Sequence, residues 1–433
     1  MRLVRPTISC KRIFCAFWIS LLCVSANAQE NSPYSRIGIG NLVSEQNILN
    51  RAMGGISLPY NDLQSVNFNN PASYAYLKVT TLDIGLDLTS RTLRSGEPVT
   101  KFNSKYLIPS YVQLGLPIKR RGNWGINIGF KPVSRINYDI EARTRLTGID
   151  SVLYNFIGSG GTYQAFVGTG FGNRNFSVGV NVGYLWGSKN YVTRLIFIND
   201  TVPYRKSNST DTTSFGGLFV QAGAFYRIEL GNDRFIRLGA NGNLQNALRA
   251  RRSLSRETFD FSNSNGTDVL DSVYRVSGEP GELIYPASYG AGIMFEKEQK
   301  WLFGVEFNQS LWANYRLYGE KDQLRNNWTL RVGGQFLPEA NGKSYWSRVV
   351  YRAGVSFGPD YIDLPNPLNQ YMLSMGASFP VRRSFYTNQY TSINMAFEVG
   401  QRGNKDNAIR ENFWRLSLGF NLSDVWFNQR KYD

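Results

Sequence analysis

The sequence contains no histidine, and its three cysteines, Cys10, Cys15 and Cys23, all lie within the first 28 residues. Without histidine, the chain lacks the usual general base of Ser-His and Cys-His hydrolases and the most common protein ligand of zinc and iron. Beyond residue 28 it also has no thiol nucleophile, thiolate ligand or disulfide framework. We therefore expect no catalytic residue, no metal site and no cofactor, and the chain is not predicted to be an enzyme.

Long apolar segments are absent as well. After residue 28, no apolar run approaches the ~20 residues that a transmembrane helix requires, which excludes a helical membrane protein. The apolar run at residues 13–24 is too short to cross a membrane, and it lies between a basic stretch and a small-residue cleavage pattern, Ala26-Asn27-Ala28. Residues 1–28 are therefore predicted to be a secretory signal peptide, so that the mature chain begins at Gln29.

The charge balance limits the choice of partners. The chain has 48 basic and 32 acidic residues, a formal net charge of +16. Its Lys and Arg residues are spread over predicted turns and loops and do not gather on one predicted face, so we expect no nucleic-acid partner. For an exported basic protein, anionic membrane lipid and lipopolysaccharide are better candidates.

Glycine and aromatic residues are abundant, with 42 Gly, 25 Tyr and 27 Phe, a composition that suits short strands and tight turns. From residue 81 onward, apolar residues alternate with Gly, Ser, Asn or charged residues, as in FSVGVNVGYLWG at residues 176–187. An alternation of period two predicts strands with one apolar face and one polar or small face. The sequence therefore predicts an all-β protein.

Fourteen such segments occur, centred near residues 85, 112, 129, 167, 181, 223, 241, 291, 308, 333, 353, 374, 397 and 417. Short connections alternate with long ones, which we expect to be external loops near residues 135–160, 190–213 and 249–283. An even strand number with this asymmetry predicts a 14-stranded antiparallel transmembrane β-barrel in the outer membrane, formed by residues 78–433. A secreted β-sandwich would also alternate, but its second face would carry Lys, Glu and Thr rather than the Gly, Ser and Asn found here.

Tryptophans near the segment ends predict two aromatic girdles at the membrane surfaces. The short-turn girdle would contain Trp124, Trp301, Trp346 and Trp426, and the long-loop girdle Trp186, Trp312, Trp328 and Trp414.

Residues 29–77 precede the first strand and show no periodicity. A barrel of fourteen strands is wide enough for an open lumen unless something fills it. Gly54 and Gly55 would allow tight turns, and Asn70, which precedes Pro71, is restricted to extended conformations. We therefore expect residues 29–77 to form a hatch that enters the barrel from the short-turn side.

Two stretches, RAMGG at residues 51–55 and NDLQSVNFNNPAS at residues 61–73, resemble the N-terminal hatch signature of the FadL/TodX family of outer-membrane transporters for hydrophobic compounds. The matching positions are Arg51, Met53, Gly54, Gly55, Asp62, Asn70, Pro71 and Ala72. The resemblance implies fourteen strands, an N-terminal hatch and a fatty-acid-like ligand. The stretch SPYSRIGIG at residues 32–40 is not part of that pattern, which indicates a divergent branch, close to relatives that serve secretion machinery.

If the apolar positions face lipid, nine charged residues face the lumen: Asp83, Asp87, Lys131, Arg237, Glu306, Arg331, Arg352, Glu398 and Arg415. Because both signs occur, these residues can neutralise one another in a solvated lumen. Alternatively, Arg237, Arg331, Arg352 or Arg415 pairs with the carboxylate of an amphiphile, which suits the guanidinium geometry. The residues themselves leave both alternatives open.

Two functions follow from these features. The first is an outer-membrane conduit or binding site for small hydrophobic molecules, gated by the hatch. The alternative is a barrel that does not transport and serves as a subunit or cargo-holding shuttle of a larger outer-membrane secretion or assembly complex.

Overall fold

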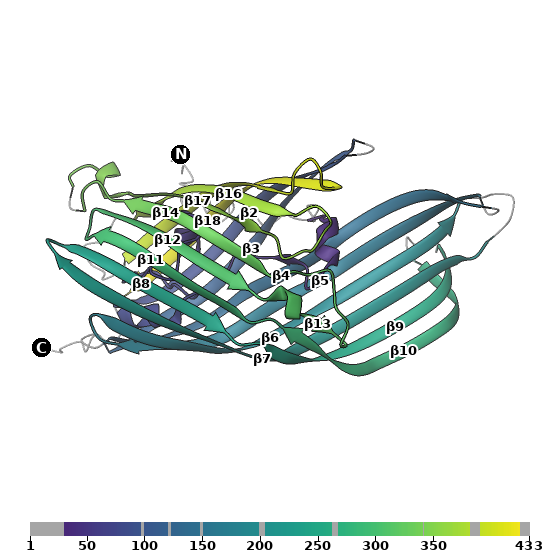
Figure 1. Cartoon of the computed structure of the whole chain (residues 1–433), viewed down its shortest axis with the longest axis horizontal. Coiled ribbons are helices and arrows are strands. Elements are labelled where there is room, and N and C mark those ends of the chain that lie inside the picture. Colours follow the sequence, from purple (N-terminus) through teal and green to yellow (C-terminus); the bar gives the residue numbers. More distant parts are fainter. Residues whose placement is uncertain are drawn as a thin grey trace, which may run out of the picture.

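Fourteen antiparallel strands close into a barrel, as the sequence predicted (Figure 1). The computed structural model describes residues 30–96, 99–119, 123–147, 150–198, 204–261, 267–340, 342–381 and 390–424, and the predicted signal peptide lies outside them. The barrel strands are β2 (Thr80–Ser95), β3 (Lys101–Lys119), β4 (Asn123–Leu146), β5 (Asp150–Gly172), β6 (Phe176–Phe197), β7 (Lys206–Gly231), β8 (Arg234–Asn243), β11 (Ser288–Lys297), β12 (Trp301–Ser310), β14 (Asn327–Phe336), β15 (Val350–Pro359), β16 (Asn369–Pro380), β17 (Tyr390–Arg402) and β18 (Ile409–Asp424). Each predicted segment corresponds to one of them.

The last strand closes the barrel on the first. β18 and β2 pair along their whole length, from Ile409 opposite Ser95 to Asp424 opposite Thr80. Closure leaves the membrane-spanning strands without an outer edge, which matters because lipid cannot satisfy unpaired backbone groups.

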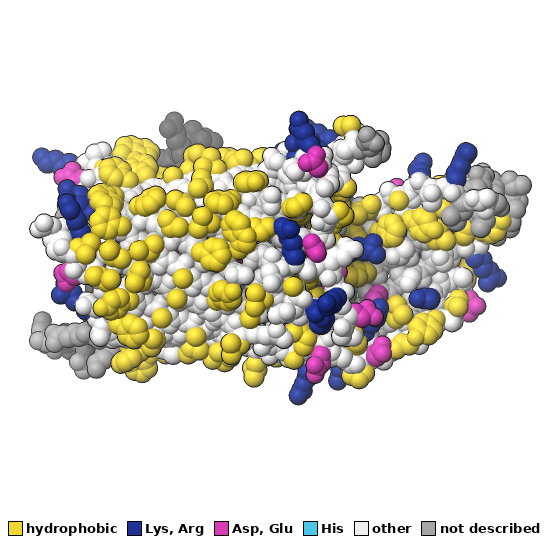
Figure 2. Space-filling view, in the orientation of Figure 1, with side chains coloured by type: hydrophobic (Ala, Val, Ile, Leu, Met, Phe, Trp, Pro, Cys, Tyr) yellow, Lys and Arg dark blue, Asp and Glu magenta, His cyan; other side chains and the backbone are white. Residues whose placement is uncertain are grey.

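The two faces of the wall alternate as the sequence predicted. On β6, Phe176, Val178 and Val182 are exposed outward, whereas Ser177 and Asn181 are buried against the interior. Figure 2 shows hydrophobic side chains gathered over the barrel, with charged side chains at its two ends and over the projecting sheet. This apolar outer band is what a membrane-spanning barrel presents to lipid.

In the three stretches that we expected to be long loops, the described residues lie mostly in strands. β8, β11, β12, β14 and β15 have ten residues each, but β4, β5, β6 and β7 have 24, 23, 22 and 26. Residues 249–261 and 267–283 belong to β9 (Asn246–Phe261) and β10 (Thr267–Tyr285), which pair with each other, and β9 also pairs with β7. These six strands form a curved sheet that projects beyond the barrel (Figure 1).

The wall separates between β3 and β4 on the long-loop side. These strands pair only from Val112 opposite Phe130 to Lys119 opposite Trp124. Above that point, the N-terminal segment covers the edge of β4: β1 (Asn41–Leu42) pairs with Ser134 and Arg135. The chain itself thus supplies backbone partners where the neighbouring strand departs.

The hatch occupies the length of the lumen. Its 3-10 turn η2 (Pro33–Arg36) contacts β4 on the long-loop side, α2 (Ile48–Arg51) contacts β16, β17 and β18, and η3 (Pro71–Tyr76) contacts β3 to β7 near the short-turn end. Our expectation that the segment enters from the short-turn side does not describe residues 30–40, which lie at the opposite end. There, Ser32 N donates to Asn137 O, and Ile39 O accepts from Ser134 Oγ, on the edge of β4 that β3 leaves without a partner.

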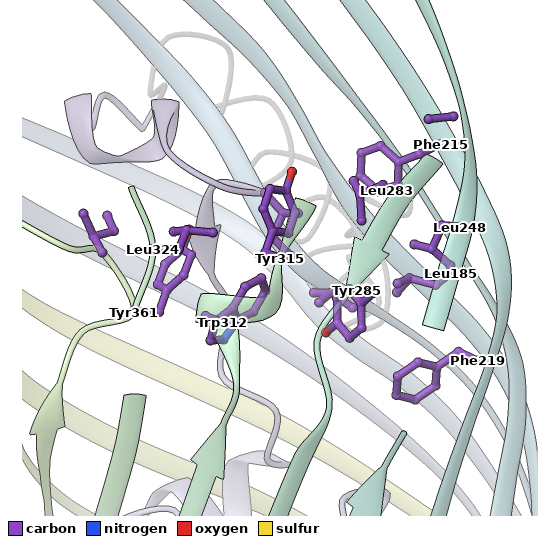
Figure 3. Packing of buried hydrophobic residues seen from close by; sticks show 14 of the residues in the cluster. Leu185, Phe215, Phe219, Leu248, Leu283, Tyr285, Trp312, Tyr315, Leu324 and Tyr361 are labelled. Carbon is purple, nitrogen blue, oxygen red and sulfur yellow. The ribbon is translucent and has the colours of Figure 1, made fainter. Parts of the chain in front are cut away.

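A buried apolar cluster closes the long-loop mouth (Figure 3). Tyr34 and Ile39 of the hatch pack there with residues of the loops that follow β12 and β15, which contain η4 (Trp312–Asn314) and Tyr361. Trp312 is 3% exposed, and its ring centroid lies 4.8 Å from that of Tyr361. Its assignment to the long-loop girdle is therefore wrong: Trp312 lies just past the end of β12, where the chain turns inward.

The other local elements are η5 (Trp346–Arg348) in the connection before β15 and β13 (Arg316–Leu317), which pairs with the base of β10. Within the described ranges, no helix has both the length and the apolar character needed to span a membrane.

Candidate functional site

The hatch makes a sharp turn next to the barrel wall. Asn47 caps α2 by accepting a hydrogen bond from Asn50 N, and the helix ends after one turn at Arg51, shortly before two glycines. Gly54 and Gly55 have φ values of +75° and +86°, which L side chains rarely adopt. A Cβ atom at Gly54 would also lie 2.9 Å from the carbonyl oxygen of Val332. Only glycine fits this turn without displacing the wall.

Gly54→Ala should therefore lower the free energy of unfolding by about 1–3 kcal/mol, the usual cost of a strained backbone conformation. The midpoint of thermal unfolding, followed by the gel-mobility change of the heated barrel, measures the effect. Gly96→Ala is the matched control, because nothing lies within 4 Å of a Cβ atom there. Equal midpoints for the two variants would contradict this account of the turn.

Arg51 connects the hatch to three barrel strands. Its guanidinium donates to both carboxylate oxygens of Asp87 (2.9 and 3.0 Å), to the carboxylate of Glu398 and to Ser417 Oγ (2.8 Å). Arg415 completes the cluster with an ion pair to Glu398 at 3.3 Å. Arg51, Asp87 and Glu398 are almost completely buried, so the cluster holds two positive and two negative charges away from solvent. Arg51, which matches the hatch signature, thus meets three of the charged residues predicted to face the lumen.

Glu306 on β12 forms a second attachment. Its carboxylate accepts hydrogen bonds from the backbone N–H groups of Ser57 (2.6 Å) and Leu58 (2.7 Å) and from Asn308 Nδ2 (2.7 Å). Arg331 on β14 pairs with it at 2.9 Å. A buried carboxylate with this many donors holds a segment of irregular backbone in a fixed place.

The part of the hatch near the short-turn end of the barrel is attached through Asn70. Its side chain accepts from Ala72 N (3.1 Å), which caps η3 at the point where Pro71 starts the turn, and its Nδ2 donates to Leu58 O (2.7 Å). Ala72 O in turn accepts from Ser177 Oγ of β6 (2.9 Å). The predicted corner thus bonds to the hatch and to the wall.

Asp62 and Asp83 act locally. Asp62 accepts from the backbone N–H groups of Gln64 (2.8 Å) and Ser65 (3.1 Å), which shapes a loop within the hatch. Asp83 accepts from Tyr111 Oη (3.2 Å) and Ser65 Oγ (3.4 Å). Neither residue takes part in the Arg51 cluster.

Arg237 and Arg352 also bind separately. Arg237 pairs with Glu296 at 2.5 Å and donates to Asn61 O of the hatch (3.4 Å). Arg352 donates to Gln335 (3.0 Å) and Ser378 (2.5 Å). All four arginines that could have met an amphiphile's carboxylate therefore already have partners in the protein.

An ionic network at the mouth was not predicted from the sequence. Glu411 on β18 accepts from Ser32 Oγ of the hatch (2.6 Å) and pairs with Arg91 (3.3 Å) and Arg402 (3.4 Å). Arg402 also pairs with Asp360 at 2.7 Å. The alternation that places Arg415 on the inner face of β18 also places residue 411 there. Extending the alternation toward the start of the strand would therefore have identified Glu411.

The stretch SPYSRIGIG forms the hatch part of this network. Burial raises the pKa of Tyr34 to about 12, so its hydroxyl stays protonated and donates to Ile409 O at 2.6 Å. The Tyr361 hydroxyl donates to the carbonyl oxygens of Gly40 and, at 3.1 Å, Ile37. The stretch that matched no transporter pattern is thus the part that closes the mouth.

A cavity of 270 Å³ remains between the hatch and the upper wall. Its lining includes Lys131, Gln164, Gln221, Asn308 and Arg415. Lys131 is buried, with its Nζ atom 5.3 Å from the ring centroid of Phe68. This lining is predominantly polar, unlike the apolar surroundings that a hydrophobic ligand requires. No group of His, Cys, Asp or Glu side chains suited to a metal ion occurs in the part of the chain that the structure describes.

Solved structures identify the class of barrel. The toluene transporter TodX of Pseudomonas putida is 14% identical, with 90% of this chain and 100% of TodX covered and a TM-score of 0.55. The toluene transporter TbuX of Ralstonia pickettii is 14% identical over 88% of this chain and 99% of TbuX, with a TM-score of 0.56. A FadL homologue of Pseudomonas aeruginosa is 16% identical over 89% and 98%, with a TM-score of 0.54. The fold is therefore that of FadL-like channels.

A protein-family model defines the chain more specifically than the FadL-like fold does. The model of the BamG family matches residues 10–433, nearly the whole sequence, and the chain belongs to the BamG family. No curated protein matches it.

Proposed function

We propose that this protein is a closed outer-membrane barrel that serves as a non-enzymatic subunit of an outer-membrane assembly complex. Residues 29–77 act in it as a fixed hatch rather than as a gate. The observation that carries the proposal is the attachment of the hatch at both ends and in the middle, through buried groups of opposite charge and backbone hydrogen bonds.

A gate has to move, and each attachment opposes movement. Displacing the hatch would leave Asp87 and Glu398 without Arg51, and Glu306 without two backbone donors. Breaking a buried ion pair typically costs about 3–5 kcal/mol, so several attachments broken together make spontaneous opening rare. This cost favours a permanently closed lumen.

The family points in the same direction. The name BamG associates the chain with an outer-membrane assembly complex, and the FadL-like fold supports an outer-membrane location. The curved sheet of β4 to β7, β9 and β10 gives such a subunit a large surface beyond the membrane. A partner protein needs a surface of this kind, whereas a conduit does not.

Transport of small hydrophobic molecules is the competing function. It is supported by the fold of the toluene transporters TodX and TbuX. Against it stand the polar lining of the 270 Å³ cavity and the internal partners of Arg237, Arg331, Arg352 and Arg415.

Purification in a mild detergent tests the proposal. We expect the tagged protein to retain one or more stoichiometric outer-membrane companions through size-exclusion chromatography, and the purified barrel to bind no radiolabelled fatty acid above the background of a boiled sample. A protein that elutes alone and binds fatty acid saturably would refute the assembly role and support transport.

A further inference from the structure

On the outer face of the wall, where β18, β2 and β3 lie side by side, basic side chains follow directly above the apolar band. In the ladder, Arg410 is opposite Arg94, and Arg94 is opposite Lys101. Lys105 lies four residue pairs closer to the membrane, opposite Ser90. We call Arg94, Lys101, Lys105 and Arg410 the basic row.

Like charges placed directly opposite one another on a sheet repel, so such a row is unfavourable without a counter-charge. None of the ion pairs among the described residues includes a member of the basic row. Arg94, Lys101 and Lys105 are exposed, and Arg410 is half-buried. The row therefore presents four cations that have no acidic partner among the described residues.

An apolar groove of 1150 Å³ adjoins the row on the same outer face. One line of cross-strand neighbours in its floor runs Val355, Leu373, Val399, Trp414 and Ser90, and the next neighbour is Lys105. Apolar side chains thus lead, strand by strand, to the first basic residue.

A second line of neighbours lies one step farther from the membrane. It runs from Phe357 and Tyr371 through Gln401 and Asn412 to Thr92. Gln401 and Asn412 supply amide donors and acceptors at the level between the apolar floor, with which Lys105 is in line, and the more distant Arg94 and Arg410. The surface changes from apolar to amide to cationic in the order of an acyl chain, its ester or amide linkage and a phosphate.

We propose that this surface binds a phosphorylated lipid of the outer leaflet, with its acyl chains in the groove and its phosphate groups on the basic row. A phosphate supplies the missing negative charge, and arginine binds it with two parallel hydrogen bonds. A protein partner would also meet the charges, but Phe397 in the groove lies on the same line of cross-strand neighbours as Leu88 and Leu107, which are exposed on the apolar outer face that lipid covers. This inference rests on the outer-membrane location proposed above.

Native mass spectrometry of the full-length mature protein in detergent, titrated with diphosphorylated lipid A, tests the proposal. We expect Arg94→Gln/Arg410→Gln to weaken binding about tenfold or more, because each basic residue near a membrane surface contributes appreciably to the attraction of anionic lipid. The control is Arg256→Gln/Arg275→Gln, which removes the same charge from the β9–β10 hairpin and should bind as the wild type does.

Two further measurements distinguish the phosphate of a lipid from free inorganic phosphate. Lipid A without its phosphates should bind much more weakly, and inorganic phosphate at millimolar concentration should not displace the diphosphorylated lipid. Trp414→Ala should weaken the binding of lipid A both with and without its phosphates. Equal binding by wild type and Arg94→Gln/Arg410→Gln, equal binding of the dephosphorylated lipid, or displacement by inorganic phosphate would each overturn the proposal. Companions retained in purification are scored separately, so failure here is distinguishable from failure of the assembly role.

Discussion

Arg51→Met should lower the free energy of unfolding by about 3–5 kcal/mol, because it removes the cation that Asp87 and Glu398 share inside the barrel. Arg415 can still neutralise Glu398, to which it is already paired. Asp87 would be left as a buried carboxylate without a cation. Thermal unfolding in detergent measures the loss, and a Met53→Cys reporter, buried in the wild type, measures whether the hatch opens.

A charge-matched control isolates this effect from the loss of packing. Arg51→Met/Asp87→Asn keeps the cluster neutral, with Glu398 and Arg415 still paired, and should recover most of the lost stability. Residues 29–433 contain no cysteine, so the reporter is the only thiol in the mature chain. If Arg51→Met unfolds at the wild-type temperature, or if adding Asp87→Asn lowers stability further, Arg51 does not hold the hatch electrostatically.

Strand positions were predictable because the alternation of a barrel wall is local. Each strand must show one face to lipid and one to the interior, and residues 176–187 carry that requirement in their order alone. Strand lengths were not predictable in the same way. β4 to β7 continue as a sheet beyond the membrane, where long polar stretches such as residues 206–214 do not differ in composition from loops.

The candidate site was predictable only as a set of inward-facing charges. The period of two places Asp87, Glu398 and Arg415 on the inner face, but pairing across strands far apart in the chain decides which of them meet. Arg51 was identified through its motif, and nothing in the sequence joins it to residue 398. The role of SPYSRIGIG was missed because its bonds depend on the separation of β3 from β4, which is a property of the folded wall.

The polar and small residues of the inner face have a different role from the one that their composition suggested. Gly, Ser and Asn on the inner face suggested a lumen filled with water, yet many of these residues bond to the hatch: Asn181, for example, donates to Phe68 O (3.2 Å) and accepts from Tyr74 Oη (3.0 Å). A wall of small and amide side chains serves irregular backbone, which must find all its hydrogen-bond partners in protein. The same inner-face composition suits both a solvated pore and a permanently filled lumen. Removing the hatch is the experiment that distinguishes them.

Deleting residues 41–72 should therefore convert the protein into an open pore. The deletion removes the Arg51, Glu306 and Asn70 attachments together. It also joins residue 40 at the mouth directly to residue 73 near the short-turn end, so residues 30–40 cannot reach their places on β4. Because a fourteen-stranded barrel is wide enough to conduct once it is empty, uptake of small polar antibiotics by cells should rise several-fold. Resistance of the barrel to unfolding in unheated SDS verifies that it still folds.

The matched control keeps the hatch and prevents it from moving. A Cβ atom at Gly419 of β18 would lie 3.4 Å from the Cβ atom of Ile48, close to the separation that a disulfide spans, so Ile48→Cys/Gly419→Cys should lock α2 to the wall when oxidised. If the protein is a closed assembly subunit, the locked form retains its companions and supports growth as the wild type does. A conduit would lose function when oxidised and regain it on reduction. An intact barrel lacking residues 41–72 that admits no polar solute would show that the hatch is not what closes the lumen.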